Sequence, residues 1–382
     1  MSKPKQARPR SIFEEVSGPE AVAVAVAAPR RPPHDRRGIA LWLKLIFLLV
    51  VAMILVGGLT RLTESGLSIT EWKPVTGALP PLDAAGWEAE FAKYKATPQA
   101  AALNPDMTLD AFKSIYWWEW GHRQLGRLIG LVWAVGFVVF LARRRIPPGW
   151  TPRLLGLGLL GGLQGAVGWW MVASGLEAGM VSVASVRLAV HLGIAFAILG
   201  LIAWYVLMLG RSDAELLQAR RQRSAAMLTW GSVLVGVAFV QILLGALVAG
   251  IDAGRGFPEW PLMAGQVFPP DAFVEVPLWR NFLDNPGLVQ FNHRVAGYLL
   301  LALGLAAWWR SRSSALGSIR RAFLGVLYML LLQVAIGIAT VLHAAPLPLA
   351  ILHQLGAIVL FSLIIRARFT AHYPAPERIA RG

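Results

Sequence analysis

The sequence predicts an all-α membrane protein in which eight transmembrane helices form two pseudo-symmetric four-helix bundles, with both termini in the cytoplasm. Three observations predict this fold. The first is a series of eight apolar runs of membrane-spanning length, and the second is the alternation of basic and acidic loops between them. The third is a set of polar landmarks that recurs in the same order in the two halves of the chain.

The composition indicates that lipid, rather than a soluble core, sets the folding rules. Of the 382 residues, 56% are hydrophobic and 15% are charged. The net charge of +15 comes from basic residues in the tails and short loops, which is a topology signal, so we expect no nucleic-acid partner. The absence of cysteine excludes disulfides, iron–sulfur clusters, thiolate zinc sites and c-type heme attachment.

Each apolar run has about 20 mostly apolar residues, the length that crosses the hydrocarbon core of a bilayer. One such run alone is compatible with a buried helix of a soluble protein, but eight in succession make that interpretation remote. The predicted spans are 40–60, 121–142, 154–174, 187–209, 227–250, 290–309, 322–342 and 348–366.

The placement of Lys and Arg orients these spans. The loops 143–153, 211–223 and 310–321 each carry four arginines. The alternate stretches are longer and more acidic, with eight acidic against five basic residues in 61–119 and five against two in 250–289. Because short basic loops remain in the cytoplasm, both termini are predicted to be cytoplasmic and the long loops to lie on the outer side.

The predicted location is the bacterial inner membrane, with the mitochondrial inner membrane as the alternative. The N-terminal tail lacks a cleavable signal pattern, and Glu14, Glu15 and Glu20 are unusual for an acid-poor transit peptide. The predicted segments are a disordered basic cytoplasmic tail at 1–38, an N-terminal four-helix bundle at 39–210, a cytoplasmic linker at 211–226, a C-terminal four-helix bundle at 227–368 and a cytoplasmic tail at 369–382.

The two halves repeat their polar landmarks, which favours duplication over chance similarity between Leu-rich helices. Four helices in each unit make the copies run the same way, related by an axis near the membrane normal. The matched landmarks are Glu71-Trp72 with Glu259-Trp260, Pro80-Pro81 with Pro269-Pro270, His122-Arg123 with His293-Arg294, Gln164-x-x-x-Gly168 with Gln333-x-x-x-Gly337, and His191 with His353.

Four of the seven histidines, His122, His191, His293 and His353, occupy these repeat-matched positions. An ionisable residue within a span is costly and therefore a functional candidate. Two neutral imidazoles facing each other across a bundle core suit the axial positions of heme iron. Copper or zinc is the alternative, although two histidines alone are a poor zinc site. His343 has no partner in the first half and is interpreted as an interfacial residue.

Three arginines, Arg123, Arg187 and Arg294, are predicted on the outer side, where the positive-inside rule disfavours them. Heme propionates are carboxylates, and Arg pairs with carboxylates bidentately. We therefore expect at least one of these arginines to contact a propionate. The alternative is that they extend to lipid phosphates.

A carboxylate distinguishes the two halves. Glu119 precedes His122 by three residues, on the same helical face, whereas Gln290 occupies the matching place before His293. Glutamate can titrate and glutamine cannot, so the first half is expected to carry the chemistry and the second a structural or electron-transfer site. The alternative is an interfacial glutamate that faces water at a helix N-terminus. Glu64, in the outer loop, is a second candidate.

At these residues the sequence resembles the heme A synthase family, membrane enzymes that oxidise a methyl group of heme O to the formyl group of heme A. The resemblance covers residues 38–368, and the lack of cysteine pairs fits the alphaproteobacterial and mitochondrial branch. His343 departs from the family pattern. The motifs are the loop Gly57-Gly58-Leu59-Thr60-Arg61-Leu62-Thr63-Glu64-Ser65-Gly66-Leu67-Ser68, Glu119-x-x-His122-Arg123, Asn292-His293-Arg294 and His353-Gln354.

The resemblance implies a function for each half. Heme O, the substrate, would bind between His122 and His191, with Glu119 essential, and a heme b cofactor between His293 and His353. One methyl group would be oxidised twice, through an alcohol to a hydrated aldehyde that loses water. The implied partners are heme O, a membrane electron acceptor, heme O synthase, cytochrome oxidase assembly factors and the lipid bilayer. A non-catalytic diheme b-type electron carrier and a repeat-built transporter are the alternatives.

Overall fold

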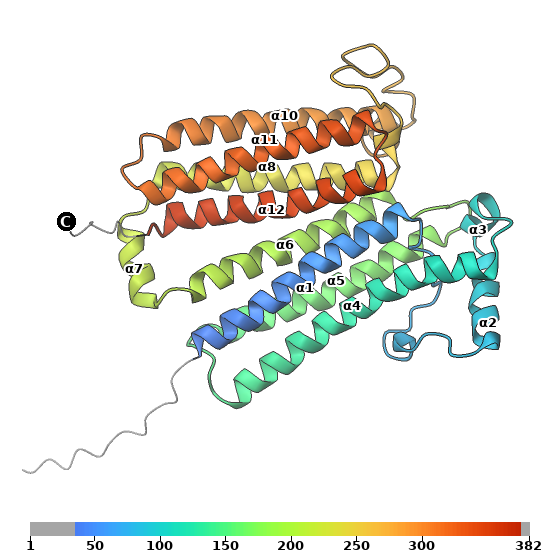
Figure 1. Cartoon of the computed structure of the whole chain (residues 1–382), viewed down its shortest axis with the longest axis horizontal. Coiled ribbons are helices and arrows are strands. Elements are labelled where there is room, and N and C mark those ends of the chain that lie inside the picture. Colours follow the sequence, from blue (N-terminus) through green and yellow to red (C-terminus); the bar gives the residue numbers. More distant parts are fainter. Residues whose placement is uncertain (1–34, 376–382) are drawn as a thin grey trace, which may run out of the picture. The chain divides into compact units, whose positions relative to one another are not determined.

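The computed structural model describes residues 35–375, so most of the predicted N-terminal tail and residues 376–382 lie outside the described part. Within it the chain is helical, with one isolated β-bridge between Met263 and Gln266 and no strand. The long helices, labelled in Figure 1, are α1 (Arg36–Leu62), α4 (Leu109–Ala142), α5 (Thr151–Gly175), α6 (Ser185–Leu209), α8 (Ala225–Gly250), α10 (Pro286–Ser311), α11 (Gly317–Leu342) and α12 (Leu347–His372).

Short helices occupy the connections. Most of them lie in the loop 63–108 between α1 and α4 and in the loop 251–285 between α8 and α10, called the outer loops after the side predicted for them, and α7 lies between the halves. They are η1 (Thr76–Ala78), α2 (Ala84–Lys95), α3 (Pro98–Leu103), α7 (Asp213–Arg221), η2 (Ala253–Arg255), η3 (Leu278–Arg280) and α9 (Asn281–Asp284).

Seven of the described helices are long and apolar enough to cross a membrane, which confirms an all-α, multi-pass membrane protein. The eighth predicted span lies in α10, which is 26 residues long but is not among these seven. Its average hydropathy is lowered by His293 and Arg294 near the start and by Trp308, Trp309 and Arg310 near the end. The count of eight spans therefore stays a prediction.

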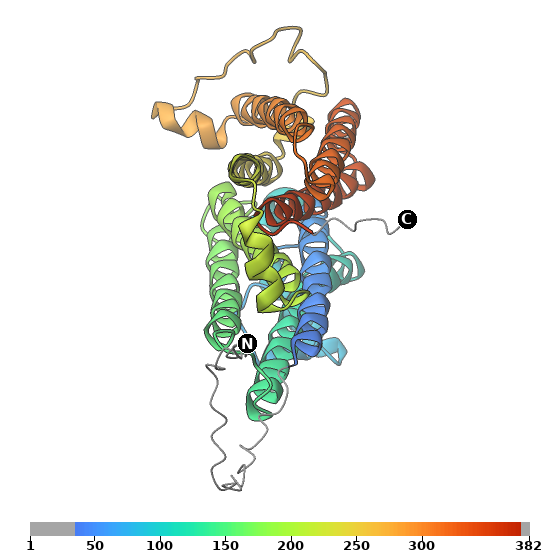
Figure 2. The same ribbon diagram turned by 90° about the vertical axis from the view of Figure 1, so that its left-hand side faces the viewer.

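The helices of each half pack in a closed ring. In the first half, α1 contacts α4 and α6, and α5 completes the ring between them. In the second half, α8 contacts α10 and α12, and α11 closes the ring in the same way. Figure 2, viewed along the helices, shows α8 and the orange and red helices grouped on one side of the blue and green ones. In each ring, the second and fourth helices are diagonally opposite.

The two rings meet through α1 and α6 on one side and α8 and α12 on the other. Phe196 on α6 and Phe361 on α12 are both buried and meet edge to face, with ring centroids 5.7 Å apart. At the outer end, Arg61 donates to Asp252 at 2.7 Å and joins the end of α1 to the end of α8. Apolar packing, this ion pair and hydrogen bonds such as that from Arg61 to the carbonyl of Gly250 thus hold the halves together.

All eight long helices begin before the apolar runs predicted for them, and α4 does so by the largest margin. Asp35 caps α1 by accepting a hydrogen bond from the backbone N–H of Gly38. Helix α4 begins 12 residues before the predicted span, because Phe112 on its first turns packs against Phe91 and Tyr94 of α2. Tyr116 packs against Trp87 of the same helix. These extra turns lift α4 into the outer loop and bring that loop close to Glu119.

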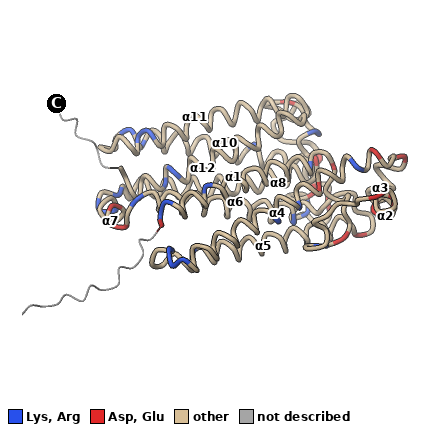
Figure 3. Tube along the Cα trace, turned by 60° about the horizontal axis from the view of Figure 1, so that its bottom comes forward, with Lys and Arg blue, Asp and Glu red and all other residues tan. Residues whose placement is uncertain are grey.

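Charge is distributed unevenly along the helix direction. Figure 3 shows Lys and Arg gathered at the end of the helices where α7 lies, and most Asp and Glu at the opposite end, near α2 and α3. This is the distribution on which the predicted orientation rests. The side of the membrane on which each end lies stays a prediction.

Candidate functional site

The four repeat-matched histidines come from the diagonal helices of the two rings. His122 is on α4 and His191 on α6, whereas His293 is on α10 and His353 on α12. The rings of His293 and His353 have centroids 6.4 Å apart and planes inclined by 77°. Facing rings at this separation leave room for one metal ion bonded to a nitrogen of each at about 2 Å.

Every one of these histidines lies against a glycine of a neighbouring helix. A Cβ atom added to any of the four glycines would lie 2.9–3.1 Å from the Cε1 atom of the imidazole, tighter than nearly all real Cβ contacts, so the ring would have to shift. The glycines therefore set how deeply each ring can lie between its neighbours. The pairs are Gly57 with His122, Gly168 with His191, Gly245 with His293 and Gly337 with His353.

Glutamines hold three of the four histidines from the same neighbouring helices. Gln164, Gln241 and Gln333 each donate from Nε2 to the backbone carbonyl of a histidine, at 3.0, 3.0 and 2.8 Å. Each glutamine lies four residues before the glycine that contacts the same histidine, so both project from one helical face. The first and third of these glutamine–glycine pairs were predicted from the repeat, whereas Gln241 with Gly245 was not. Its spacing to Gly245 was the available signal.

The donor set and the cavity fit heme. Among the described residues, no group of three or more His, Cys, Asp or Glu is placed to hold a metal ion, which disfavours a protein-only zinc or copper site. All four histidines line one cavity of about 1340 Å³. Ligand pockets usually measure about 300–1,000 Å³, so this cavity has room for more than one large ligand. The Nδ1 atoms of His122 and His191 are buried without a hydrogen-bond partner in the described structure.

Glu119 is buried and attached to both its own helix and the outer loop. Its Oε2 accepts hydrogen bonds from the Ser68 hydroxyl and the Ile69 backbone N–H, both at 2.8 Å. Its Oε1 accepts from Arg123 Nη2 at 2.6 Å and Nε at 3.1 Å. Arg123 also donates to the carbonyls of Ile69 and Glu71. These contacts occupy about four acceptor positions, the full capacity of a carboxylate.

The matching residues of the second half hold the matching loop without a charge. Gln290 and Arg294 both donate to the carbonyl of Phe257, at 3.3 and 3.0 Å. Gln290 is as deeply buried as Glu119, each being 3% exposed. In both halves, therefore, the residue three positions before the histidine forms hydrogen bonds to the preceding loop. Only in the first half, at Glu119, does that residue carry a negative charge.

The remaining predicted residues lie in different surroundings. Arg123 and Arg294 line the cavity, as does Glu64, which is exposed and has a positive φ of 56°. Arg187 is not among the cavity-lining residues; it donates to the carbonyl of Trp170 and lies 3.5 Å from Glu177. His343 ends α11, is exposed and is outside the cavity lining. Contact of at least one of the three arginines with a propionate stays a prediction.

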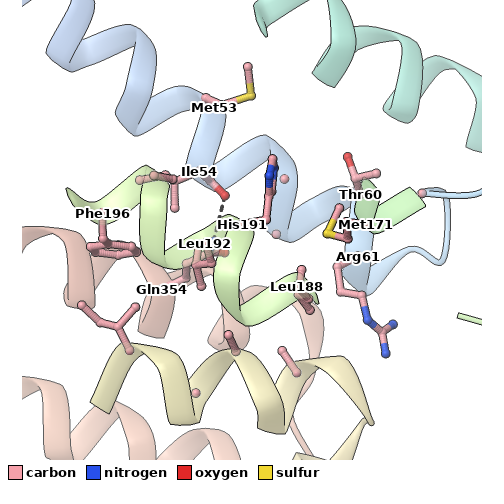
Figure 4. Close-up of a pocket in the computed structure, with 18 of the residues that line it drawn as sticks. Met53, Ile54, Thr60, Arg61, Met171, Leu188, His191, Leu192, Phe196 and Gln354 are labelled. Carbon is pink, nitrogen blue, oxygen red and sulfur yellow. Dashed lines mark hydrogen bonds between the residues drawn. The ribbon is translucent and has the colours of Figure 1, made fainter. Parts of the chain in front are cut away.

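Gln354, which follows His353, links the two rings beside the cavity. Its Nε2 donates to the carbonyl of Ile54 on α1 at 2.8 Å, and its side chain occupies the space that a Cβ on Gly58 would need. Figure 4 shows this hydrogen bond together with His191 and Met53, which line the same cavity. The second histidine pair is thus anchored directly to a helix of the first half.

Comparison with known proteins identifies relatives along most of the chain. Residues 40–365 match the COX15-CtaA family model, described as cytochrome oxidase assembly protein. The chain is 60% identical over 369 residues to the Heme A synthase of Dinoroseobacter shibae, covering 96% of each chain. It is 61% identical over 376 residues to that of Ruegeria pomeroyi, covering 97% of this chain and 98% of the relative. It is 61% identical over 339 residues to that of Paracoccus denitrificans, covering 89% of each.

The family match includes all four histidines and all or most of each of the eight long helices, and these relatives align with most of the chain. The resemblance read from the histidine and glutamate motifs is thereby confirmed. The chain belongs to the COX15-CtaA family of cytochrome oxidase assembly proteins.

Proposed function

We propose that the protein is a heme A synthase of a bacterial inner membrane, which oxidises a methyl group of heme O to the formyl group of heme A. The observation that carries this proposal is the pair of matched histidine sites that differ in charge at Glu119 and Gln290. The names of the relatives support the same activity. In this proposal heme O binds between His122 and His191, and heme b between His293 and His353.

The proposed reaction is two successive two-electron oxidations of one carbon. Each adds the oxygen of a water molecule to the carbon and releases two protons and two electrons, which pass to a membrane electron acceptor. The first gives the alcohol and the second the hydrated aldehyde, which loses water to give the formyl group. When bound, heme b supplies one-electron redox chemistry between the substrate and that acceptor.

Within this reaction we assign Glu119 an electrostatic role. Removing electrons from the methyl group develops positive charge on its carbon, and a fixed carboxylate stabilises that charge. Because donors already fill the acceptor positions of Glu119, proton acceptance would first require one of those hydrogen bonds to break. Ser68 and Arg123 hold the carboxylate still and so reduce the reorganisation needed during the reaction.

The wall of α5 supports placing the substrate in the first half. Cβ atoms added at Gly161, Gly162 or Gly165 would meet nothing within 4 Å. The second half has Leu330, Leu331 and Val334 at the matching positions of α11, by the register that aligns the two glutamine-glycine pairs. The glycines leave more space in the first site, as a substrate that enters and leaves requires. The larger side chains of α11 leave less space in the second site, which suits a cofactor that stays bound.

Pigment analysis of the purified protein tests the proposal. We expect acid-acetone extracts from a host that makes heme O to contain heme b together with heme O or heme A, identified by mass. Replacing His293 or His353 with Ala should deplete heme b, and replacing His122 or His191 should deplete heme O and heme A instead. A protein with heme b alone would support the electron-carrier alternative, and a protein without heme the transporter.

A further inference from the structure

In the second site, each of the two histidines accepts a hydrogen bond from a glutamine at its backbone carbonyl, whereas in the first site only one histidine does. His293 receives Gln241 from α8, and His353 receives Gln333 from α11. In the first site, His191 receives Gln164 from α5. Each glutamine lies four residues before the glycine that contacts the same histidine. The corresponding position for His122 is therefore on α1, four residues before Gly57.

That residue is Met53. Its methyl carbon Cε lies 3.4 Å from a Cβ built on Gly126, four residues after His122. In the second half, Gln241 Nε2 lies 3.3 Å from a Cβ built on Gly297, four residues after His293. The two side chains thus occupy the same slot beside their histidine helices.

Because Met53 stands where the second half has Gln241, the first half has no hydrogen-bond donor at this position beside the histidine helix. A thioether is at most a weak acceptor and donates nothing, whereas the glutamine amide donates to the histidine backbone. The Nδ1 atom of His122 is buried and has no hydrogen-bond partner in the described structure. In the described structure His122 therefore has the glycine contact without a glutamine, while His293 has both.

We propose that Met53 makes His122 the releasable axial ligand, so that the first site can be loaded with substrate and emptied of product, and that Gln241 makes the second site permanent. This inference rests on the proposed function, because it assumes that heme is exchanged in one site and retained in the other. Residues that orient a metal-ligating histidine typically change metal affinity by about 10–100-fold. Met53 and Gln241 are positioning residues, since they act through the histidines.

Reciprocal swaps at these two positions provide the test. The full-length protein, purified in detergent with its hemes bound, is mixed with excess apomyoglobin, and heme transfer is followed by absorbance while the remaining pigment is identified by mass. For the unmodified protein we expect heme O or heme A to leave quickly and heme b slowly. Met53→Gln should slow the first transfer, and Gln241→Met should accelerate the second, each by about 10–100-fold.

Met53→Leu is the matched control, because it keeps an apolar side chain of similar volume and removes the sulfur. We expect it to lose heme O or heme A at the unmodified rate. If Met53→Leu retained its pigment as firmly as Met53→Gln, sulfur rather than the missing donor would matter, and the proposal would be overturned. If Met53→Gln did not fold, unchanged heme b loss from Gln241→Met would overturn it equally.

The same measurement separates this inference from the proposed function. Two pigments that leave at equal rates, unaffected by either swap, would overturn the role of Met53 and Gln241 and leave the proposed function standing. A protein that never contains heme O or heme A in a host that makes heme O would contradict the proposed function, and the inference with it.

Discussion

Arg123 Nη2 donates to Glu119 Oε1 at 2.6 Å across one turn of α4, with 17% and 4% of the two side chains exposed. The same guanidinium reaches the carbonyl of Ile69, whose N–H donates to the same carboxylate. Helix and outer loop are therefore joined around one negative charge. In the second half, Gln290 and Arg294 join the matching loop through the backbone carbonyls of Phe257 and Leu262, without a carboxylate.

Replacing Glu119 with Gln should abolish heme A formation while both sites still bind heme. The amide keeps the size of the side chain but not its charge, and loss of one fixed electrostatic group typically lowers kcat by about 10²–10³-fold. The measurement is the ratio of heme A to heme O in membranes that contain equal amounts of protein. A normal ratio would exclude the assigned role.

Ser68→Ala is the control for that experiment. It removes one of the two hydrogen bonds to Oε2 but keeps the charge and the ion pair. We expect a loss of about 1 kcal/mol in the free energy of unfolding and a far smaller effect on heme A than in Glu119→Gln. Equal defects in the two variants would indicate that Glu119 only holds the loop.

The apolar runs and charged loops predicted the helical fold, and the motifs predicted the family. These features are local in sequence, since each depends on about 20 consecutive residues or on a fixed spacing. The early start of α4 was not predicted, because it depends on Phe112 and Tyr116 packing against a separate helix in the outer loop. Hydropathy alone does not report such contacts.

The hydrogen bonds of Arg123 and Gln241 could not be predicted from the sequence. Arg123 was a candidate for contact with a propionate, but its principal contacts are with Glu119 and the loop carbonyls, which only the folded loop reveals. Gln241 has the same spacing to its glycine as the two glutamines that were recognised. Its partner His293 lies 52 residues away, so the pairing follows from the packing of α8 on α10.

Gly337→Ala should weaken heme b binding without weakening the helix. A Cβ there would lie 3.0 Å from His353 Cε1, so the imidazole must move. Alanine favours an α-helix over glycine by about 1 kcal/mol, and displacing a metal-ligating histidine typically costs about 10–100-fold in affinity. The measurement is heme b content per protein after purification. Gly325→Ala, on the same helix with nothing within 4 Å of the added carbon, should keep its heme.

Glu71 gives the outer loop a stability that depends on pH. Hydrogen bonds from Lys73 and Lys93 lower the pKa of Glu71 from 4.5 to about 2. The folded-state pKa is depressed, so this stabilisation is complete above pH 4.5 and is lost as the pH falls towards 2. Because the carboxylate is 43% exposed, the effect should be about 1 kcal/mol or less and should diminish with added salt.

Thermal unfolding of Glu71→Gln measures this contribution. The variant should unfold at a lower temperature than the unmodified protein at pH 6, and the difference should shrink as the pH is lowered below 4. A difference that stays constant over this range would show that the ion pairs to Lys73 and Lys93 are not its cause.

Gly165→Val should narrow the first site by giving it the residue that α11 has at Val334. A Cβ added there meets nothing within 4 Å, and valine is slightly more favourable than glycine in a helix, so stability should not fall. Gly165 lines the cavity, so the valine occupies space that the proposed substrate needs. We expect less heme O and heme A per protein and unchanged heme b, measured by pigment mass. Gly156→Val, also in open space but outside the cavity lining, should change neither, and equal loss of both pigments in Gly165→Val would contradict a substrate site beside α5.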